Sequence, residues 1–569
     1  MMKKVFLVMV IVLITVNGYG QIPQWQWAKA GNGAIYGQEV ESLDIANDAN
    51  GNIYITGWFA DTLIFGNDSL FSNGNPVVFL IKFDSSGNEL WSKISSYDGE
   101  GFGVTTDRTG NIYITGFFTG PTITFDSIAI TNMGGEDAFV VKYTAAGQIL
   151  WARDIGGPGG EEGYAVTTDS SGNVYMTGFY TSAPLIFAND TLYRLGVGSD
   201  ILLVKFDSLG NKLWAVSGGG PYSDYGNSVT TDNFGAVYIT GYFSSPYGIF
   251  GADSFLTNNG LDFFIAKYAT SDGHLMWAKN AGGTNNSRGQ SMASDKSGNV
   301  FCTGNFTGSI ILNSDTMFTT AIGKSFFIAK YDSSGNVLWA KNTTGPAGSN
   351  TFGLSLVTDS LGNVYISSAM GEVSNGDSIL YLDTLTLIRP PLWDPTFIVK
   401  FNPSGHALWD VVLGSGGNQT NSNSISVSNT NDVYITGYFD LNPFIIGNDT
   451  LILIGEDAPF IAKLGFINSE ASIPKITPTS PAITLFPNPN NGTFTLSYHL
   501  SQSGIPNSEL KITDVTGRTL YSLYISNLEG QETLTLPLSS GIYFWQMLSN
   551  DGLQFHQNII GNGKIVLIK

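Results

Sequence analysis

Carboxylates are the only abundant side chains of this chain whose types suit catalysis. The sequence holds 46 acidic and 26 basic residues but only four histidines, which are His274, His406, His499 and His556. Pairs of carboxylates hydrolyse glycosidic bonds by acid–base catalysis, so the residue types leave this chemistry open. A Ser-His-Asp triad has few histidines to draw on, and the sequence contains no His-x-x-x-His, Cys-x-x-Cys or Gly-x-Ser-x-Gly motif. We therefore predict no catalytic residue.

Most of the carboxylates stand at positions that recur along the chain. A segment of the type Gly-Asn-Val-Tyr-Ile-Thr-Gly occurs seven times, and three positions before it stand Asp48, Asp107, Asp169, Asp232, Asp295, Asp359 and, in the last copy, Ser428. Because an active site is not repeated in every copy of a scaffold, we interpret these aspartates as turn residues. Glu161 and Glu162 lie outside this pattern, and we interpret them as a solvated feature of a loop.

Calcium is the one ion that the recurring oxygens suit. Asn-Asp-Ser/Thr and Asp-x-x-Gly-Asn loops recur, but none has the Asp-x-Asp-x-Asp-Gly spacing of a calcium-binding loop. We therefore predict no cofactor and no metal-ligating residue, with structural calcium as the open alternative. His274 and His406 follow turn glycines in different repeats and are predicted to be turn residues. Cys302 is the single cysteine and is predicted to be a buried thiol.

The elements that position these residues belong to a repeat of about 60 residues. Six copies carry a tryptophan four residues after a turn glycine, at Trp91, Trp151, Trp214, Trp277, Trp339 and Trp409. A buried tryptophan removes about 150–250 Å² from water, so we interpret the periodic set as packing elements. The segment before each turn is of the type Phe-Ile-Ala-Lys-Tyr, and its lysine is predicted to lie outward or at a sheet edge.

Each copy is predicted to form four strands, because β-branched and aromatic segments alternate with Gly, Asn, Asp and Ser clusters. The last copy lacks its tryptophan strand, whereas Trp25-Gln-Trp27-Ala-Lys29 precedes the first copy. A first strand that completes the last sheet closes a ring and leaves no open edge. The sequence thus predicts an all-β chain, with a seven-bladed β-propeller over residues 21–466 that is closed by its N-terminal strand.

The repeat resembles the secreted bacterial β-propeller repeat known as SBBP. The resemblance rests on Phe-Ile-Ala-Lys-Tyr-Asp-Ser-Ser-Gly-Asn-Val-Leu-Trp-Ala-Lys, which ends at Lys341, and on the Asp-x-x-Gly-Asn-Val-Tyr-Ile-Thr-Gly segments. It recurs in register over about three quarters of the chain. The resemblance implies a propeller and an extracytoplasmic setting, and it implies no single activity.

Both ends of the chain carry features of exported proteins. Residues 1–20 combine a basic start, a short apolar run and small residues, so we predict a signal peptide that is cleaved between Gly20 and Gln21. No later apolar stretch reaches ~20 residues, which predicts no transmembrane segment after signal removal. Residues 467–481 are rich in Ser, Thr and Pro and are predicted to be a linker.

Residues 482–569 are predicted to form a small immunoglobulin-like β-sandwich, because about seven short strands follow one another there. Their motifs resemble the C-terminal sorting domain of Bacteroidetes type IX secretion, and the matching positions are Pro487, Asn488, Pro489, Gly492, Gly517, Gly541, Tyr543 and Lys569. The resemblance implies the type IX secretion machinery as a partner and removal of this domain near the linker. It also implies a secreted protein, or one attached to the outer-membrane surface.

Charge and departures from the repeat bear on the ligand. The formal net charge of −20 predicts no nucleic-acid partner, which would need a basic surface. The sixth copy departs most from the repeat, and its longer excursion contains Arg389, Trp393 and Asp394. Tryptophan and arginine are common anchors of recognition surfaces, so these three residues are the candidate ligand contacts.

Three functions stay open. The favoured one is an exported, surface-anchored or secreted binding scaffold for a glycan or a protein, because propellers gather loops on one face. The alternative is a secreted carbohydrate-active hydrolase or lyase with carboxylates in the central channel. The third is a purely structural component of the envelope. A cluster of non-repeating acidic residues at the axis favours the enzyme, and the absence of such a cluster favours binding.

Overall fold

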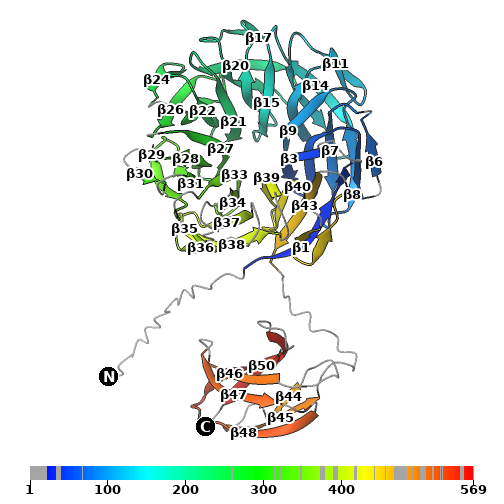
Figure 1. The fold of residues 1–569 in the computed structure, drawn as a ribbon, viewed down its shortest axis with the longest axis vertical. Coiled ribbons are helices and arrows are strands. Elements are labelled where there is room, and N and C mark those ends of the chain that lie inside the picture. Colours follow the sequence, from blue (N-terminus) through cyan, green and yellow to red (C-terminus); the bar gives the residue numbers. More distant parts are fainter. Residues whose placement is uncertain are drawn as a thin grey trace, which may run out of the picture. The chain divides into compact units, whose positions relative to one another are not determined.

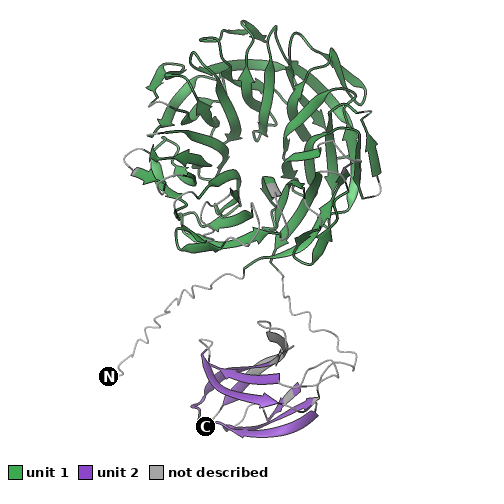
Figure 2. Cartoon of the chain, viewed as in Figure 1, with its two compact units in different colours: residues 1–467 green, residues 468–569 purple. Residues whose placement is uncertain are grey.

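The computed structural model describes residues 22–567 with internal gaps. The gaps are residues 34–39, 67, 73, 258–259, 284, 313–314, 320–322, 347–348, 372–378, 389–394, 415–419, 441–442, 455–456, 467–482, 488–490, 500–507, 515–517, 526, 528 and 551–556. The chain divides into two compact units, residues 1–467 and 468–569 (Figure 2). Every regular element in the described ranges is a strand, so the prediction of an all-β chain is confirmed. The predicted signal peptide and linker lie outside the described residues.

The larger unit repeats an antiparallel sheet of four strands, which pair in the order first, second, third and fourth (Figure 1). The first strands are β3 (Val40–Asn47), β9 (Gly99–Thr106), β15 (Glu161–Thr168), β21 (Asp224–Thr231), β27 (Ser287–Ser294), β33 (Thr351–Thr358) and β39 (Thr420–Val427). The second strands are β4 (Ile53–Phe59), β10 (Ile112–Phe118), β16 (Val174–Tyr180), β22 (Ala236–Phe243), β28 (Val300–Thr307), β34 (Val364–Met370) and β40 (Val433–Phe439).

The outer half of each sheet holds the third and fourth strands. The third strands are β7 (Val77–Phe83), β13 (Asp137–Tyr143), β19 (Asp200–Phe206), β25 (Asp262–Ala269), β31 (Lys324–Tyr331), β37 (Thr396–Phe401) and β43 (Ala458–Gly465). The fourth strands are β8 (Glu89–Ile94), β14 (Ile149–Ile155), β20 (Lys212–Gly219), β26 (Leu275–Ala281), β32 (Val337–Asn342), β38 (Ala407–Leu413) and, from the N-terminal end of the chain, β1 (Gln24–Ala30).

A short hairpin lies between the second and third strands of each sheet in the sequence. The hairpins are β5 (Thr62–Phe65) with β6 (Asp68–Phe71), β11 (Thr122–Phe125) with β12 (Ile128–Thr131), β17 (Leu185–Phe187) with β18 (Asp190–Leu192), β23 (Tyr247–Phe250) with β24 (Asp253–Leu256), β29 (Ser309–Leu312) with β30 (Asp315–Phe318), β35 (Ile379–Leu382) with β36 (Leu385–Ile388), and β41 (Phe444–Ile446) with β42 (Asp449–Leu451). The short strand β2 (Asn32–Gly33) pairs with β5. The hairpin of β23 and β24 continues the sheet that contains β20, whereas most of the other hairpins form separate two-stranded sheets. Figure 1 labels several of them at the periphery.

The burial of each strand follows its place in the sheet. All seven residues of β13 are buried, because a central strand between packed sheets has two covered faces. The first strand β9 instead alternates buried and half-buried residues at its start. The turn aspartates close the hairpins as predicted for them: Asp48 Oδ1 accepts bonds of 2.9 Å from the amides of Asn50 and Asn52, and Gly51 takes a φ of 82°.

The recurring lysines are buried, so the prediction that they lie outward or at an edge is wrong. Lys142 is 6% exposed, and its Nζ donates to Ser208 O of the next sheet at 2.9 Å. Trp151 Nε1 donates to the same oxygen at 3.2 Å. The lysine also lies over the ring of Tyr113, 5.0 Å from its centroid. These contacts offset the desolvation of the ammonium group, which lowers the pKa of Lys142.

We call this arrangement the lysine–tryptophan clamp: the lysine and the tryptophan of one sheet donate to one carbonyl in a turn of the next. It recurs for Lys82 and Trp91 on Ala145 O, Lys205 and Trp214 on Thr270 O, Lys267 and Trp277 on Ser333 O, and Lys330 and Trp339 on Pro403 O. The period of the tryptophans thus reflects contacts between sheets.

The N-terminal strand connects the last sheet to the first. β1 pairs antiparallel with β43, and Ala28 lies opposite Ala462. From this position, Trp27 Nε1 donates to Ser85 O in the turn of the first sheet at 3.3 Å. The first strand of the first sheet also contacts the second strand of the last sheet, because Ser42 Oγ and Thr436 Oγ1 lie 2.6 Å apart. In Figure 1 the sheets follow one another around a central opening.

The smaller unit contains two antiparallel sheets around one core. One sheet has the order β44 (Ile483–Phe486), β45 (Thr493–His499) and β48 (Glu529–Thr535). The other has the order β47 (Thr519–Ile525), β46 (Ser508–Thr513), β49 (Gly541–Asn550) and β50 (Gln557–Leu567). Phe494 and Leu496 of the first sheet share a buried cluster with Ile512 and Met547 of the second, so the hydrophobic core lies between the sheets.

The clamp predicts that its two donors substitute for each other. Lys142→Met and Trp151→Phe each leave one donor for Ser208 O, so we expect a loss of roughly 1 kcal/mol in the free energy of unfolding for each. The double variant removes both donors, and we expect its loss to exceed the sum by about 0.5–1 kcal/mol. Urea denaturation of the four proteins measures this coupling, and strictly additive losses would contradict the shared role.

Candidate functional site

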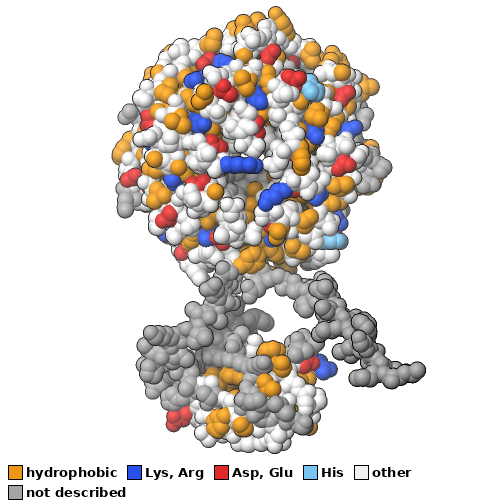
Figure 3. All heavy atoms as spheres, turned by 180° about the vertical axis from the view of Figure 1, so that it is seen from behind, with side chains coloured by type: hydrophobic (Ala, Val, Ile, Leu, Met, Phe, Trp, Pro, Cys, Tyr) orange, Lys and Arg blue, Asp and Glu red, His pale blue; other side chains and the backbone are white. Residues whose placement is uncertain are grey.

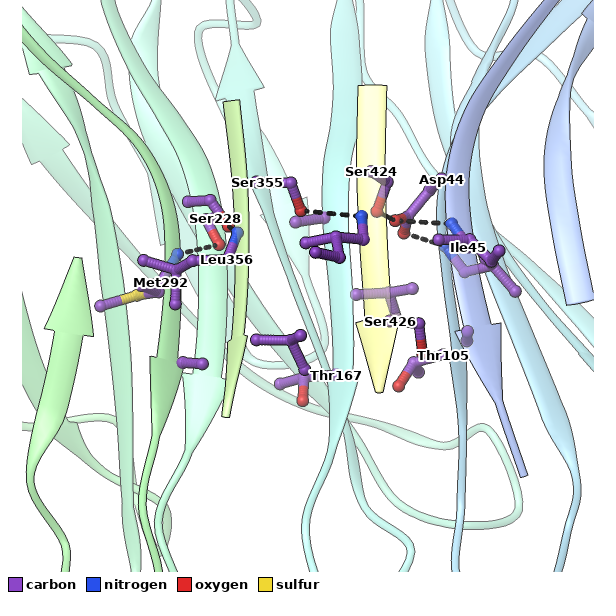
Figure 4. Close-up of a pocket in the computed structure, with 18 of the residues that line it drawn as sticks. Asp44, Ile45, Thr105, Thr167, Ser228, Met292, Ser355, Leu356, Ser424 and Ser426 are labelled. Carbon is purple, nitrogen blue, oxygen red and sulfur yellow. Dashed lines mark hydrogen bonds between the residues drawn. The ribbon is translucent and has the colours of Figure 1, made fainter. Parts of the chain in front are cut away.

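The first strands surround a cavity of about 400 Å³ at the centre of the larger unit (Figure 4). Small polar side chains line it and connect one strand to the next. Ser228 Oγ accepts from Met292 N at 3.1 Å, Ser291 Oγ accepts from Leu356 N at 3.1 Å, and Ser355 Oγ accepts from Ile425 N at 3.3 Å. A hydroxyl at this position therefore satisfies an amide of the neighbouring sheet.

Asp44 departs from this serine pattern. Its Oδ2 accepts from Val104 N at 2.7 Å, and its Oδ1 accepts from Ser424 Oγ at 2.6 Å and from Ile45 N at 2.9 Å. The carboxyl thus joins the last sheet to the first and the first to the second. Burial raises the pKa of Asp44 to about 6, against the hydrogen bonds, which lower it. Among the described residues that line the cavity, Asp44 is the one charged side chain.

Sequence reasoning did not single out Asp44, although its signal was present. The equivalent position holds Gly103, Ala165, Ser228, Ser291, Ser355 and Ser424 in the other sheets. An aspartate in a column of small residues is a non-repeating acidic group at the axis. The lining holds no second one among its described residues, so Asp44 does not form the acidic cluster that would favour an enzyme.

Half-buried aromatic rings lie close together at one end of three consecutive sheets, near where the first strands begin and the second strands end. We call this set the aromatic arc, and it consists of Phe102, Phe117, Tyr164, Phe179, Tyr225 and Tyr242. Phe102 and Tyr164 lie 5.5 Å apart between ring centroids, and Tyr225 and Tyr242 lie 5.2 Å apart. Phe102 and Tyr164 also line the central cavity, so the aromatic arc adjoins that cavity, which we also call the channel.

Charged groups flank the aromatic arc. The guanidinium of Arg288 lies 4.5 Å from the ring centroid of Tyr242. In β15, the strand that also carries Tyr164, burial and the nearby carboxyl of Glu136 together raise the pKa of Glu162 to about 8. The prediction of a solvated loop feature for Glu161 and Glu162 is wrong, because both lie in strand β15 and Glu161 is fully buried. Strand alternation points Glu162 toward the arc and Glu161 into the protein.

The candidate ligand contacts Arg389, Trp393 and Asp394 lie outside the described residues, as do Gly20 and Gln21. Of the sorting-domain positions, Asn488, Pro489, Gly517 and Lys569 also lie outside them, whereas Pro487, Gly492, Gly541 and Tyr543 are described. Tyr543 packs in the core of the smaller unit, and its hydroxyl donates to Ser539 O at 2.9 Å. Tyr543 therefore has a structural role in the small domain.

The remaining predicted residues are structural. Cys302 is buried and free, as predicted, and burial raises the pKa of its thiol. His274 is exposed at a turn, with its Nδ1 2.7 Å from Asp272 Oδ1. Within the described ranges, no group of three or more His, Cys, Asp or Glu is placed to hold a metal ion. No helix among those ranges is long and apolar enough to span a bilayer.

Charged side chains of both signs are dispersed over the face of the larger unit that Figure 3 shows. On the face shown in Figure 3, Lys and Arg lie singly among acidic, polar and apolar side chains. A nucleic-acid-binding face would instead gather them in a stripe or patch. The distinctive chemistry of the larger unit is therefore in the channel and the aromatic arc.

The C-terminal part of the chain matches a known family. Residues 484–561 match the secretion system C-terminal sorting domain, so the predicted type IX sorting domain is confirmed. This domain marks the protein for export to the extracellular space or the outer-membrane surface, and it implies an interaction with the secretion machinery.

Two curated proteins are similar to parts of this chain. The chain is 25% identical over 506 residues to an uncharacterized WD repeat-containing protein (L264) of Acanthamoeba polyphaga mimivirus, which covers 71% of this chain and 35% of that protein. It is 26% identical over 140 residues to the regulatory protein FlaEY of Caulobacter vibrioides, which covers 24% of this chain and 14% of that protein. The chain thus matches only about a third or less of the length of either relative.

Two solved structures of unknown function also show similarity. A protein from Bacteroides caccae is 12% identical with a TM-score of 0.28, and the alignment covers 56% of this chain and 92% of that one. A protein from Bacteroides thetaiotaomicron is 9% identical with a TM-score of 0.26, and the alignment covers 76% of this chain and 100% of that one.

The raised pKa of Asp44 predicts how the free energy of unfolding depends on pH. A carboxyl with a folded pKa of about 6 is protonated more readily in the folded state than in the unfolded state, so its charge destabilises the protein as pH rises from about 4 to 7. Asp44→Asn removes this charge. Relative to the unchanged protein, we expect the variant to gain about 1–2 kcal/mol in the free energy of unfolding between pH 4 and pH 8.

Urea denaturation across this pH range measures the difference, and the constant effect of altered hydrogen bonds cancels in the slope. Asp44→Ser, which copies the residue of the neighbouring sheets, is the matched control and should show the same pH trend. A difference that does not change with pH would contradict a buried, charged Asp44.

Proposed function

We propose that this exported protein is a surface-displayed or secreted binding protein that recognises a glycan at the aromatic arc. In this proposal the larger unit is a seven-bladed β-propeller closed by its N-terminal strand, and the sorting domain is the export signal of the propeller. The arc carries the proposal, because it places half-exposed aromatic rings next to the mouth of a channel, where packing alone does not require them.

Closure of the ring is supported by contacts between the two ends of the larger unit. β1 from the N-terminal end pairs along its length with β43. Trp27 supplies the tryptophan half of a clamp on Ser85 O, in the same way that Trp151 does on Ser208 O. Asp44 and Ser424 add a hydrogen bond at the axis. A closed ring of sheets leaves only short, protected sheet edges, which suits a protein exposed outside the cell.

The chemistry of the arc suits a saccharide. Aromatic faces pack against the apolar C–H faces of sugar rings, while nearby charged and polar groups bond to hydroxyls. Tyr164 and Tyr225 stack nearly parallel, with 15° between their planes and 6.4 Å between their centroids. Glu162 lies in the same strand as Tyr164, and the guanidinium of Arg288 lies 4.5 Å from the ring centroid of Tyr242. The arc therefore combines apolar platforms with a hydrogen-bonding rim.

Hydrolysis of the bound glycan is the second candidate, and Glu162 is the observation that favours it. A carboxyl with a pKa of about 8 is protonated near neutral pH and can act as a general acid, and Glu136 lies close enough to raise its pKa. Glycosidases need such an acid together with a second, ionised carboxyl. In contrast, all of the bonds recorded for Asp44 at the axis are structural, which supports binding over catalysis in the channel.

A glycan array with the full chain tests the proposal. We expect saturable binding to a subset of glycans, and a loss of at least roughly tenfold in affinity for Tyr164→Ala combined with Tyr225→Ala, since each stacked ring contributes about 1 kcal/mol or more. Tyr193→Ala removes a tyrosine that is 67% exposed and lies outside the arc, and it should bind normally. Thermal unfolding of each variant shows whether the fold is intact.

The outcomes separate the three functions. Binding that persists in the double variant would place recognition elsewhere. Release of reducing sugar that disappears in Glu162→Gln would favour the hydrolase. If the folded protein bound no glycan, this result would contradict glycan recognition and favour the structural role.

A further inference from the structure

One side of the channel mouth is acidic beside the aromatic arc. The second residue of the first strand is a glutamate in three consecutive sheets, at Glu41 of β3, Glu100 of β9 and Glu162 of β15. Each lies directly opposite an aromatic residue of the second strand, which is Trp58, Phe117 or Phe179. Side chains that oppose each other in an antiparallel pair share one face of the sheet. Each of these three sheets therefore presents a carboxyl group next to a half-buried ring.

Ring contacts join two of these glutamates into one surface. Phe179, which lies opposite Glu162, is 5.7 Å from Tyr164 between ring centroids. Tyr164 is in turn 5.5 Å from Phe102 of the preceding sheet, and Phe102 follows Glu100 by two residues in β9. Aromatic rings of two neighbouring sheets therefore lie in contact with one another between the two glutamate positions.

Cations of the protein itself lie over other rings at this end of the sheets. The guanidinium of Arg288 is 4.5 Å from the ring centroid of Tyr242, and Lys324 Nζ is 4.9 Å from that of Phe352. Arg288 and Phe352 hold, in β27 and β33, the position that the glutamates hold in their own strands. In the described parts of the chain, no lysine or arginine lies over the rings opposite the glutamates. A cation on those rings must therefore come from a ligand.

Repulsion between carboxyl groups makes this side of the mouth favourable for a positive ligand. Burial and the neighbouring carboxyls of Glu136 and Glu100 together raise the pKa of Glu162 to about 8. Among the described residues, no lysine or arginine forms an ion pair with Glu162. A bound cation offsets both the burial and the repulsion of these carboxylates, whereas a neutral or anionic ligand does not.

We propose that the aromatic arc takes an amino sugar whose nitrogen is a free ammonium group, with Glu162 and Glu100 as its carboxylate partners. This inference rests on the proposed function, because it names the class of glycan that the arc recognises. The C–H face of the sugar packs against Tyr164 and Phe179, and the ammonium group lies beside the two carboxylates. An ammonium group has three N–H donors and a positive charge, so it supplies the counter-charge that a hydroxyl or an N-acetyl group lacks.

Isothermal titration calorimetry of the full chain with two matched oligosaccharides tests this inference. They are the β-1,4-linked hexamer of glucosamine and the same hexamer of N-acetylglucosamine, which differ only in whether the nitrogen carries a charge or an acetyl group. We expect the glucosamine hexamer to bind at least roughly tenfold more tightly, as a charge-assisted hydrogen bond allows. In Glu100→Gln combined with Glu162→Gln this preference should vanish, while Tm does not fall.

Two single variants are the controls. Asp272→Asn removes the same charge in the turn between β25 and β26, at the other end of the strands from Tyr242, and it should keep the preference. Arg288→Gln removes the cation over Tyr242 and should keep the preference as well. Loss of the preference in Asp272→Asn would contradict the inference, because it would assign the difference to the overall charge of an acidic protein.

The remaining outcomes separate this inference from the proposed function. Equal affinity for the two hexamers overturns the inference and leaves glycan recognition in place. No binding of any glycan by the folded chain overturns both. A hexasaccharide of uronic acids that binds more tightly than the glucosamine hexamer, and loses this binding in Arg288→Gln, assigns the arc to anionic glycans. A hexalysine peptide that binds as tightly as the glucosamine hexamer, with the same dependence on the two glutamates, assigns the arc to a basic protein segment.

Discussion

The lysine–tryptophan clamp is the contact on which the larger unit depends. A single four-stranded sheet has two apolar faces and cannot bury them alone, so it needs a neighbour on each side. The clamp fixes that neighbour at one distance and one register, because an ammonium and an indole N–H converge on one turn carbonyl. The glycine in that turn completes the fit, since Gly210, at a φ of 80°, lies against Trp151 closely enough that a Cβ would sit 2.7 Å from its ring.

Repetition of one junction turns a local contact into an architecture. The same clamp recurs between consecutive sheets, which follow one another around a central opening (Figure 1). The N-terminal strand then supplies Trp27 to the last sheet, where the final repeat has no tryptophan strand of its own. Asp44 marks the same seam at the axis, where it bonds to Ser424 and to Val104. The seam thus has contacts on both its inner and its outer side.

Function is expected where residues depart from the repeat. The turn aspartates and the clamps are alike in most sheets and support the scaffold. The aromatic arc, Arg288 and Glu162 occur in only some sheets, as do the buried carboxylates at the starts of β13, β15, β19 and β21. These departures are concentrated in consecutive sheets on one side of the unit. These sheets therefore differ chemically from the rest of the larger unit, although their backbone follows the common pattern.

The sequence by itself determined the strand content, the period, the turn aspartates, the buried Cys302 and the sorting domain, because each depends on local chemistry or on a contiguous motif. It did not determine burial of Lys142, the role of Asp44 or the surroundings of Glu161 and Glu162. A lysine in a strand looks exposed until the tyrosine beneath it and the carbonyl of the next sheet are known, and that carbonyl is 66 residues away. Likewise, the charge of Asp137 acts on Glu161 only because two sheets pack there. Local sequence determined the strands and turns, whereas tertiary packing alone determined which charged side chains are buried.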